Sequence, residues 1–176
     1  MSAMHQAASF STTALLRNGR QIEIRALRPD DRAELLAAAA RTSDQSLYRR
    51  FFSIRRAFSD EEVAAFMNVD FVAEVALIAV TRERGRQVVA GGGRYILIHP
   101  GTAELAFVVV DEFQRQGIAS ALLHHLTVLA RAAGVREFIA EVLPDNSAML
   151  RVFERSGLTM QRKLETGVVH ITLQIA

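Results

Sequence analysis

The spacing of apolar side chains in the first two thirds of the chain predicts one strand, three helices and then a strand meander. Residues 21–27 alternate between polar and apolar side chains, as a half-buried β-strand does. Apolar residues then recur at helical spacing in three segments that begin with helix-starting residues, at 28–40, 43–52 and 59–67. Three apolar runs joined by short polar turns follow, and their lengths predict antiparallel strands at 75–81, 87–98 and 104–110.

The last third of the chain is organised around one amphipathic segment. Residues 117–133 carry an apolar stripe that includes Leu122 and Leu126, and they end before Gly134, which favours a helix with a glycine after its last turn. A strand, a second helix and a final hairpin are then predicted, at 137–142, 146–156, 159–165 and 168–175.

These elements predict an α/β (α+β) fold with a mixed, mostly antiparallel central sheet flanked by helices. Residues 21–176 have the size of one domain with a single core. Residues 1–20 show no strong periodicity, so we expect a flexible N-terminal tail before that domain.

Composition narrows the classes of partner. Hydrophobic residues make up 50% of the 176 residues, charged residues 23%, and the net charge is +2, with no dense basic run, so no nucleic-acid partner is expected. No apolar run approaches the roughly 20 residues of a membrane span, and the first residues do not resemble a signal peptide, so we expect a cytoplasmic protein. The chain has no cysteine, which excludes disulfides, thiolate metal ligands and a cysteine nucleophile.

The five histidines do not have the spacing of a metal site, so no metal is expected. His124 and His125 lie off the apolar stripe of the predicted helix, and we interpret them as part of a solvated face.

The connection between the strand at 104–110 and the helix at 117–133 predicts an anion site. A helix start leaves backbone N–H groups without partners, and the helix dipole makes that end positive, so a phosphate fits there. Gly117 and Ala119 have small side chains that allow close approach, and Arg115 adds positive charge. On local pattern alone, an ordinary strand-to-helix connection is an equal alternative. The two standard glycine-rich phosphate motifs, G-x-G-x-x-G and G-x-x-x-x-G-K-[ST], are absent.

The motif Q-x-x-G-x-A at residues 114–119 resembles the coenzyme-A signature of the GNAT N-acyltransferase superfamily. The resemblance extends from about Gln21 to the C-terminus in the same order of elements, including a helix that begins at Asn146 and ends before Gly157. Residues 46–53 and 68–77 are similar to the acetyltransferase domain of Pat-type bacterial protein lysine acetyltransferases.

This resemblance implies acetyl-CoA as the co-substrate. It also implies that the strand before the loop splays at a bulge, where freed backbone groups bind the pantetheine arm. The residues that it assigns to the co-substrate are Phe107, Val108, Val109, Val110, Gln114, Arg115, Gln116, Gly117, Ile118, Ala119, Ser120, Asn146 and Phe153.

Glu104 is the candidate general base, because a lysine ammonium, with a reference pKa near 10.4, must lose its proton before it attacks a thioester. Glu104 lies one strand length before the loop, and it matches the base of the Pat-like branch; the alternative is an ordinary surface carboxylate. Many GNAT enzymes have a tyrosine acid where this chain has Phe153, so no general acid is assigned, although Tyr48 and Tyr95 are conceivable substitutes.

The expected function is therefore transfer of an acetyl group from acetyl-CoA to a lysine side chain of a protein, directly within a ternary complex. The resemblance implies a protein substrate such as an acyl-CoA synthetase-type enzyme, and a monomer or homodimer. Two alternatives stay open: a small-molecule amine as acceptor, and a non-catalytic acyl-CoA-binding sensor.

Overall fold

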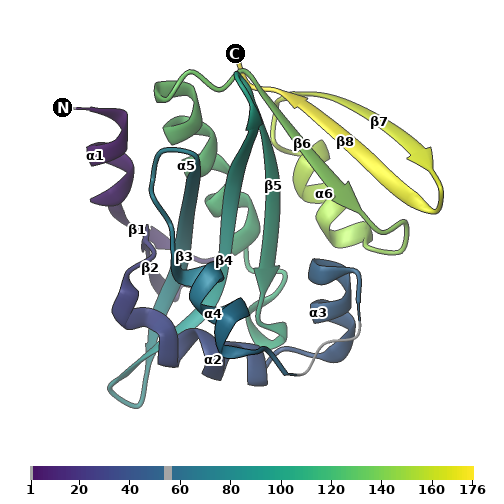
Figure 1. Cartoon of the computed structure of the whole chain (residues 1–176). Coiled ribbons are helices and arrows are strands. Elements are labelled where there is room, and N and C mark those ends of the chain that lie inside the picture. The colour runs from purple at the N-terminus through teal and green to yellow at the C-terminus, as the bar shows by residue number, and fades with distance from the viewer. Residues whose placement is uncertain (1, 54–56) are drawn as a thin grey trace.

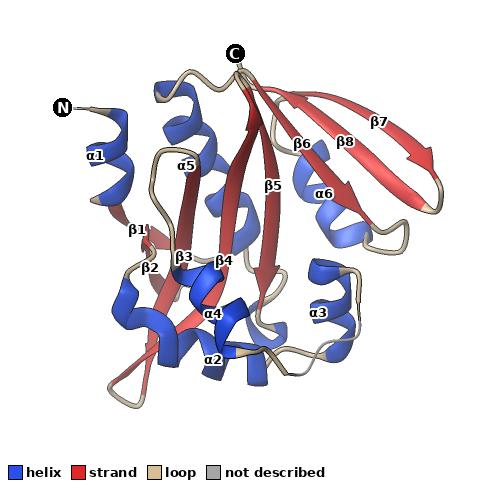
Figure 2. Ribbon diagram, viewed as in Figure 1, coloured by secondary structure: helices blue, strands red, loops and turns tan. Residues whose placement is uncertain are grey.

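A computed structural model describes residues 2–53 and 57–176 of the protein. Its centre is an eight-stranded sheet in the order β1-β2-β3-β4-β5-β6-β8-β7, with helices on both faces (Figures 1 and 2). The described elements are α1 (Ala3–Ala8), β1 (Ser11–Leu15), β2 (Gln21–Ala26), η1 (Pro29–Asp31), α2 (Arg32–Ala40), α3 (Asp44–Phe51), α4 (Asp60–Met67), β3 (Glu74–Glu83), β4 (Arg86–His99), β5 (Thr102–Val109), η2 (Asp111–Phe113), α5 (Ile118–Ala132), β6 (Glu137–Val142), α6 (Ser147–Glu154), β7 (Thr159–Glu165) and β8 (Val168–Gln174).

The predicted mixed, mostly antiparallel sheet is confirmed. Neighbouring strands pair antiparallel except for β5 and β6, which run parallel. The helix starts follow the local sequence as expected. Ser43 and Ser59 cap α3 and α4, and Glu62 completes a capping box with Ser59.

The N-terminal segment is not the unstructured tail that its sequence suggested. Residues 3–8 form α1, and β1 pairs antiparallel with β2 at the edge of the sheet. Phe10, between them, lies over His125 on α5, with 5.2 Å between the ring centroids. The prediction failed because a short edge strand is stabilised by its neighbour, so its own sequence need not alternate strongly.

Two layers of helices position the site. α5 packs against β3, β4 and β5, and its buried residues include Leu122 and Leu126. α2 and α3 lie against β4 and β5 on the other face of the sheet (Figure 1). Because side chains alternate along a strand, Phe107 of β5 faces α5, whereas Ala106 and Val108 face α2 to α4.

The three consecutive glycines of β4, Gly91 to Gly93, lie beside a bulge. The pairing of β3 with β4 shifts register between Ala79 and Val80, which leaves Ala90 as an extra residue before Gly91. At Gly93 the Phe107 ring occupies the space of a side chain, since an added Cβ would lie 2.5 Å from its Cδ1 atom. The bulge expected in the strand before the loop is not present in β5, because its register with β4 is regular from 103 to 109.

Candidate active site

The most open feature of the sheet is the separation of β5 from β6. Their parallel pairing covers residues 102–104 and 137–139, after which β6 pairs with β8 alone among the described strands. Figure 1 shows the two strands together at one end and apart at the other. One edge of β5 therefore has backbone groups that no described strand satisfies, beginning directly after Glu104.

The direction of these backbone groups decides which of the residues predicted to bind the co-substrate can do so through their backbone. The Val110 amide donates to the Ala90 carbonyl at 2.9 Å, so it faces β4 and is already used. Backbone groups alternate along a strand, so those of Val108 also face β4, while those of Phe107 and Val109 face the gap. The Val109 carbonyl already accepts from the Gln114 side chain at 3.0 Å.

The floor of the gap is aromatic. Phe153 of α6 is 1% exposed and packs against Phe107, with 6.2 Å between ring centroids. The Phe153 ring is therefore buried by the protein's own side chains. It packs under β5 and leaves almost no surface for contact with a ligand. Asn146 caps α6, because its side chain accepts a hydrogen bond from the Met149 amide at 3.2 Å.

The loop that follows β5 has the geometry of an anion site. Arg115 and Gly117 have φ values of 63° and 100°, and this left-handed backbone turns successive amides toward one side. Gly117 gives α5 no side-chain cap, and the amides of Ile118, Ala119 and Ser120 have no partner within the described ranges. These amides, the dipole of a 15-residue helix and the exposed Arg115 together favour a negatively charged ligand.

The two glutamine side chains of this loop are used inside the protein. Gln114 donates to Val109 and to the Ser46 hydroxyl, and Gln116 donates to the Glu112 carbonyl. The Asn18 side chain donates to the Gln116 carbonyl oxygen at 3.2 Å. Both glutamines hold the loop in shape, so they offer a ligand their backbone and not their side chains.

Helix α3 is tied to the same loop through Asp111. The Ser43 hydroxyl donates to Asp111 at 2.7 Å, and the Ser46 hydroxyl donates to the same oxygen at 3.2 Å. Burial alone would raise the pKa of Asp111, but these hydrogen bonds outweigh it and keep that pKa below its ordinary value. No local pattern in the sequence predicts this tie, which fixes α3 beside the end of β5.

Glu104 is exposed on the α2–α4 face of the sheet, and its position is set by both neighbouring strands. It pairs with Ile96 of β4 on one side and with Ile139 on the other, and Ile139 is the last residue of β6 that pairs with β5. The Arg50 guanidinium of α3 lies near enough to Glu104 for the two charges to attract each other. Glu104 is thus the point where the gap begins and where α3 faces β5.

Neither tyrosine is shown beside this point. Tyr95 is 1% exposed, and its ring lies against Phe138, 5.7 Å between centroids, inside the core. Burial raises the pKa of Tyr95 to about 12, so it is a poor proton donor. Tyr48 lies on α3 and is 43% exposed.

No group of three or more potential metal ligands occurs in the part of the chain that the structure describes. The same part contains no helix of sufficient length and hydrophobicity to cross a bilayer.

The sequence motif and the separated strands point to the same family, and comparison with known families decides it. The model of the acetyltransferase (GNAT) domain matches residues 21–159. This chain belongs to the GNAT acetyltransferase family. The predicted resemblance to Pat-type proteins is also confirmed. The chain is 33% identical over 173 residues to the acetyltransferase Pat of Mycolicibacterium smegmatis, a match that covers 95% of this chain and 50% of that protein. The chain thus spans half the length of this relative.

Solved structures agree with this GNAT assignment. The crystal structure of the GNAT domain of S. lividans PAT superposes with a TM-score of 0.84 at 36% identity, over 93% of this chain and 96% of that one. The GNAT fold is also shared with yncA from Salmonella typhimurium, which was solved with acetyl-CoA, at a TM-score of 0.69 and 19% identity, over 88% and 94% of the two chains.

Proposed function

We propose that this GNAT protein transfers an acetyl group from acetyl-CoA to the side-chain amine of lysine in a protein, with Glu104 as the general base. The observation that carries the proposal is the position of Glu104 as the last residue of β5 that pairs with β6, where the gap between these two strands begins. A base at that point is next to the free backbone edge of β5 and also faces the α3 side of the sheet.

The loop and the strand would hold the two ends of acetyl-CoA. The free amides at the start of α5, with Arg115, suit the pyrophosphate. The gap-facing backbone of Phe107 and Val109 suits the amides of an extended pantetheine arm. Glu104 precedes Val109 by five residues, which is about 17 Å along a strand, and this length brings the thioester end of the arm to the base.

The chemistry then needs few further groups. Glu104 accepts the proton that the lysine ammonium loses, and the free amine attacks the thioester carbonyl. The new C–N bond forms as the C–S bond breaks, and the thiolate leaves with the electron pair and takes up the second proton, which the nitrogen loses as it becomes an amide. A thiol has a reference pKa near 8.5, so this departure is feasible without a strong acid. That agrees with the phenylalanine at position 153 and with the burial of Tyr95.

A protein acceptor is favoured over a small polyamine by the environment of Glu104. The cavity on its side of the sheet is mainly apolar and carries Arg50 and Arg94. These cations would repel a free polycation more strongly than the single charge of a lysine side chain, and the apolar walls give the other amines of a polyamine no partners. An acyl-CoA synthetase-type enzyme is our first candidate acceptor, on the resemblance to Pat-type proteins alone.

The test compares Glu104→Gln with the wild type for acetyl-CoA binding and for acetylation of protein lysines. We expect unchanged binding by calorimetry and a turnover lowered by about a hundredfold or more at neutral pH. Glu165→Gln, a change in the exposed β7–β8 hairpin, is the matched control and should keep full turnover. Full turnover in Glu104→Gln would show that Glu104 is not the general base. If the wild type binds acetyl-CoA but acetylates no protein in a cell lysate, the alternative of a non-catalytic acyl-CoA-binding sensor would be favoured.

A further inference from the structure

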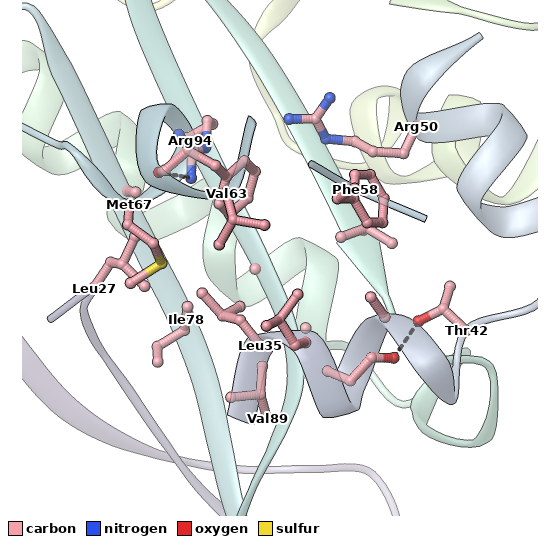
Figure 3. A pocket seen from close by; sticks show the side chains of 18 of the residues that line it. Leu27, Leu35, Thr42, Arg50, Phe58, Val63, Met67, Ile78, Val89 and Arg94 are labelled. Atoms are coloured by element: carbon pink, nitrogen blue, oxygen red, sulfur yellow. Dashed lines mark hydrogen bonds between the residues drawn. The ribbon is translucent and has the colours of Figure 1, made fainter. Parts of the chain in front are cut away.

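A second site lies under the helices that cover the α2–α4 face of the sheet. It is a cavity of about 390 Å³ enclosed by α2, α3, α4 and strands β3 to β5, and most of its lining side chains are aliphatic or aromatic. Figure 3 shows Leu35, Val63, Ile78 and Val89 among them. A cavity of about 150 Å³ is enough for benzene, so this one has room for on the order of ten carbon atoms or more.

One end of this cavity is positively charged. Figure 3 shows the guanidinium of Arg50 directed toward the side where Arg94 lies. Burial, with a smaller repulsion from Arg94, lowers the pKa of Arg50 to about 10, although Glu104 and Glu74 partly offset both effects. Arg50 still carries its proton at neutral pH, so the cavity combines an apolar interior with a charged end.

The other polar side chains of the lining already have partners. Arg94 is ion-paired with Glu74 and donates to the Phe66 carbonyl at 3.0 Å. The Thr42 hydroxyl donates to the Ala38 carbonyl, the Glu62 carboxylate accepts from the Ser59 amide, and Arg32 is paired with Asp60.

Arg50 differs from these residues. No described carboxylate lies within ion-pair distance of it, and the contact that it makes is with its neighbour, since its guanidinium carbon lies 4.7 Å from the Phe51 ring centroid. A partly buried guanidinium without a hydrogen-bonded anion is a costly arrangement in a protein. Its five donors form a planar fork that matches a carboxylate.

We propose that this cavity binds a medium-chain fatty carboxylate, with its carboxylate on Arg50 and its aliphatic tail between α2, α4 and the sheet. The apolar walls account for the tail, and the unpaired guanidinium accounts for a single negative charge at one end. An amine of the same length would be repelled by Arg50 and Arg94. An uncharged chain would leave Arg50 without a partner.

This site goes beyond the proposed acetyl transfer and does not depend on it. One consequence does rest on the proposed function: the charged end of the cavity lies beside Glu104, so a bound carboxylate would stand where the acceptor lysine arrives. We therefore expect inhibition by the fatty acid to be competitive with the acceptor and not with acetyl-CoA. Binding of the fatty acid itself is measured without any acetylation assay, so the two ideas fail separately.

The binding experiment titrates the whole chain with octanoate, 1-octanol and octylamine by calorimetry. Methyl NMR shifts of Ile78 and Val89 report whether the ligand enters the cavity. We expect octanoate to bind with shifts at both residues, and octanol and octylamine to bind at least about tenfold more weakly, since a hydrogen bond to a charged group contributes about 1.5–3 kcal/mol.

Two variants separate the parts of the site. Arg50→Met keeps the length of the side chain and removes the charge, so octanoate should bind about tenfold more weakly while octanol is unaffected. Val63→Phe fills the tail region and should abolish binding of both. Arg86→Met, an exposed arginine at the start of β4, is the charge control and should bind octanoate like the wild type. Thermal melting of each variant verifies that it is folded.

Equal binding of octanoate and octanol by the wild type would overturn the proposal, because it would show a cavity that only accepts apolar chains. Octanoate binding without shifts at Ile78 and Val89 would overturn it too, because the ligand would lie elsewhere. The wild-type comparison needs no variant, so the proposal stays testable even where Arg50→Met does not fold.

Discussion

The close approach of β4 to the Phe107 ring makes Gly93 more sensitive to an added side chain than Gly92, its neighbour in the strand. A methyl group at Gly93 would lie 2.5 Å and 2.7 Å from two carbons of that ring and 3.2 Å from a Leu126 methyl. Contacts below 3.0 Å cannot persist, so the ring must move, and Phe107 is held by Phe153 on its other side. Overpacking of this kind costs about 1–3 kcal/mol, so Gly93→Ala should unfold roughly 2–12 °C below the wild type.

Gly92→Ala is the matched control, one residue away in the same strand. Its methyl group would meet the Leu77 carbonyl at 3.3 Å, a tight contact but not an overlap. Replacing a strand glycine by alanine also removes flexibility from the unfolded chain, which offsets part of the strain. Calorimetry measures the melting temperature of each variant. The double variant Gly93→Ala/Phe107→Leu should recover part of the stability that Gly93→Ala loses, because leucine is smaller than phenylalanine. A Gly93→Ala variant that melts within about 1 °C of Gly92→Ala would refute this reasoning.

Two further predictions concern stability. Arg25 and Asp31 form a bidentate ion pair, and the two residues are only 2% and 3% exposed. Asp31→Asn should therefore lower the free energy of unfolding by about 3–5 kcal/mol in urea titrations, whereas Asp30→Asn, at an exposed position, should change it by no more than about 0.5 kcal/mol. Equal losses of unfolding free energy in the two variants would contradict this prediction. Burial, with a smaller repulsion from His124, lowers the pKa of His125, so the unfolded chain takes up a proton more readily and stability should fall as the pH drops through about 6.5. His125→Gln should weaken that fall between pH 7.5 and 5.5 in melting experiments, and an unchanged pH dependence would exclude His125 as its source.

The elements that the sequence predicted well are those whose signals are local. The capping box of Ser59 and Glu62 and the glycine after α5 involve residues within one turn of each other, and the structure keeps them. The strands on either side of the 166–167 turn form a hairpin for the same reason. Local hydrogen bonds of this kind are the same in any fold that contains the segment.

The errors concern contacts between distant parts of the chain. The N-terminal strand depends on pairing with β2, and the partial burial of His125 depends on Phe10, so neither was visible in a local pattern. A bulge was expected in β5, whereas that strand keeps a regular register with β4 and separates from β6 after Glu104. The ties from Ser43 and Ser46 to Asp111 cross more than 60 residues of sequence, and no spacing rule predicts them.

The sequence by itself determined the order of helices and strands, and it marked the loop at 114–119 as a helix start suited to an anion. Those properties follow from side-chain periodicity and from the unpaired amides of any helix start. The tertiary structure alone decided that β5 leaves β6 directly after Glu104, and that Arg50 ends at an apolar cavity without forming an ion pair with a described carboxylate. Strand separation and burial depend on which distant surfaces meet, and that is fixed only when the sheet and both helix layers have packed.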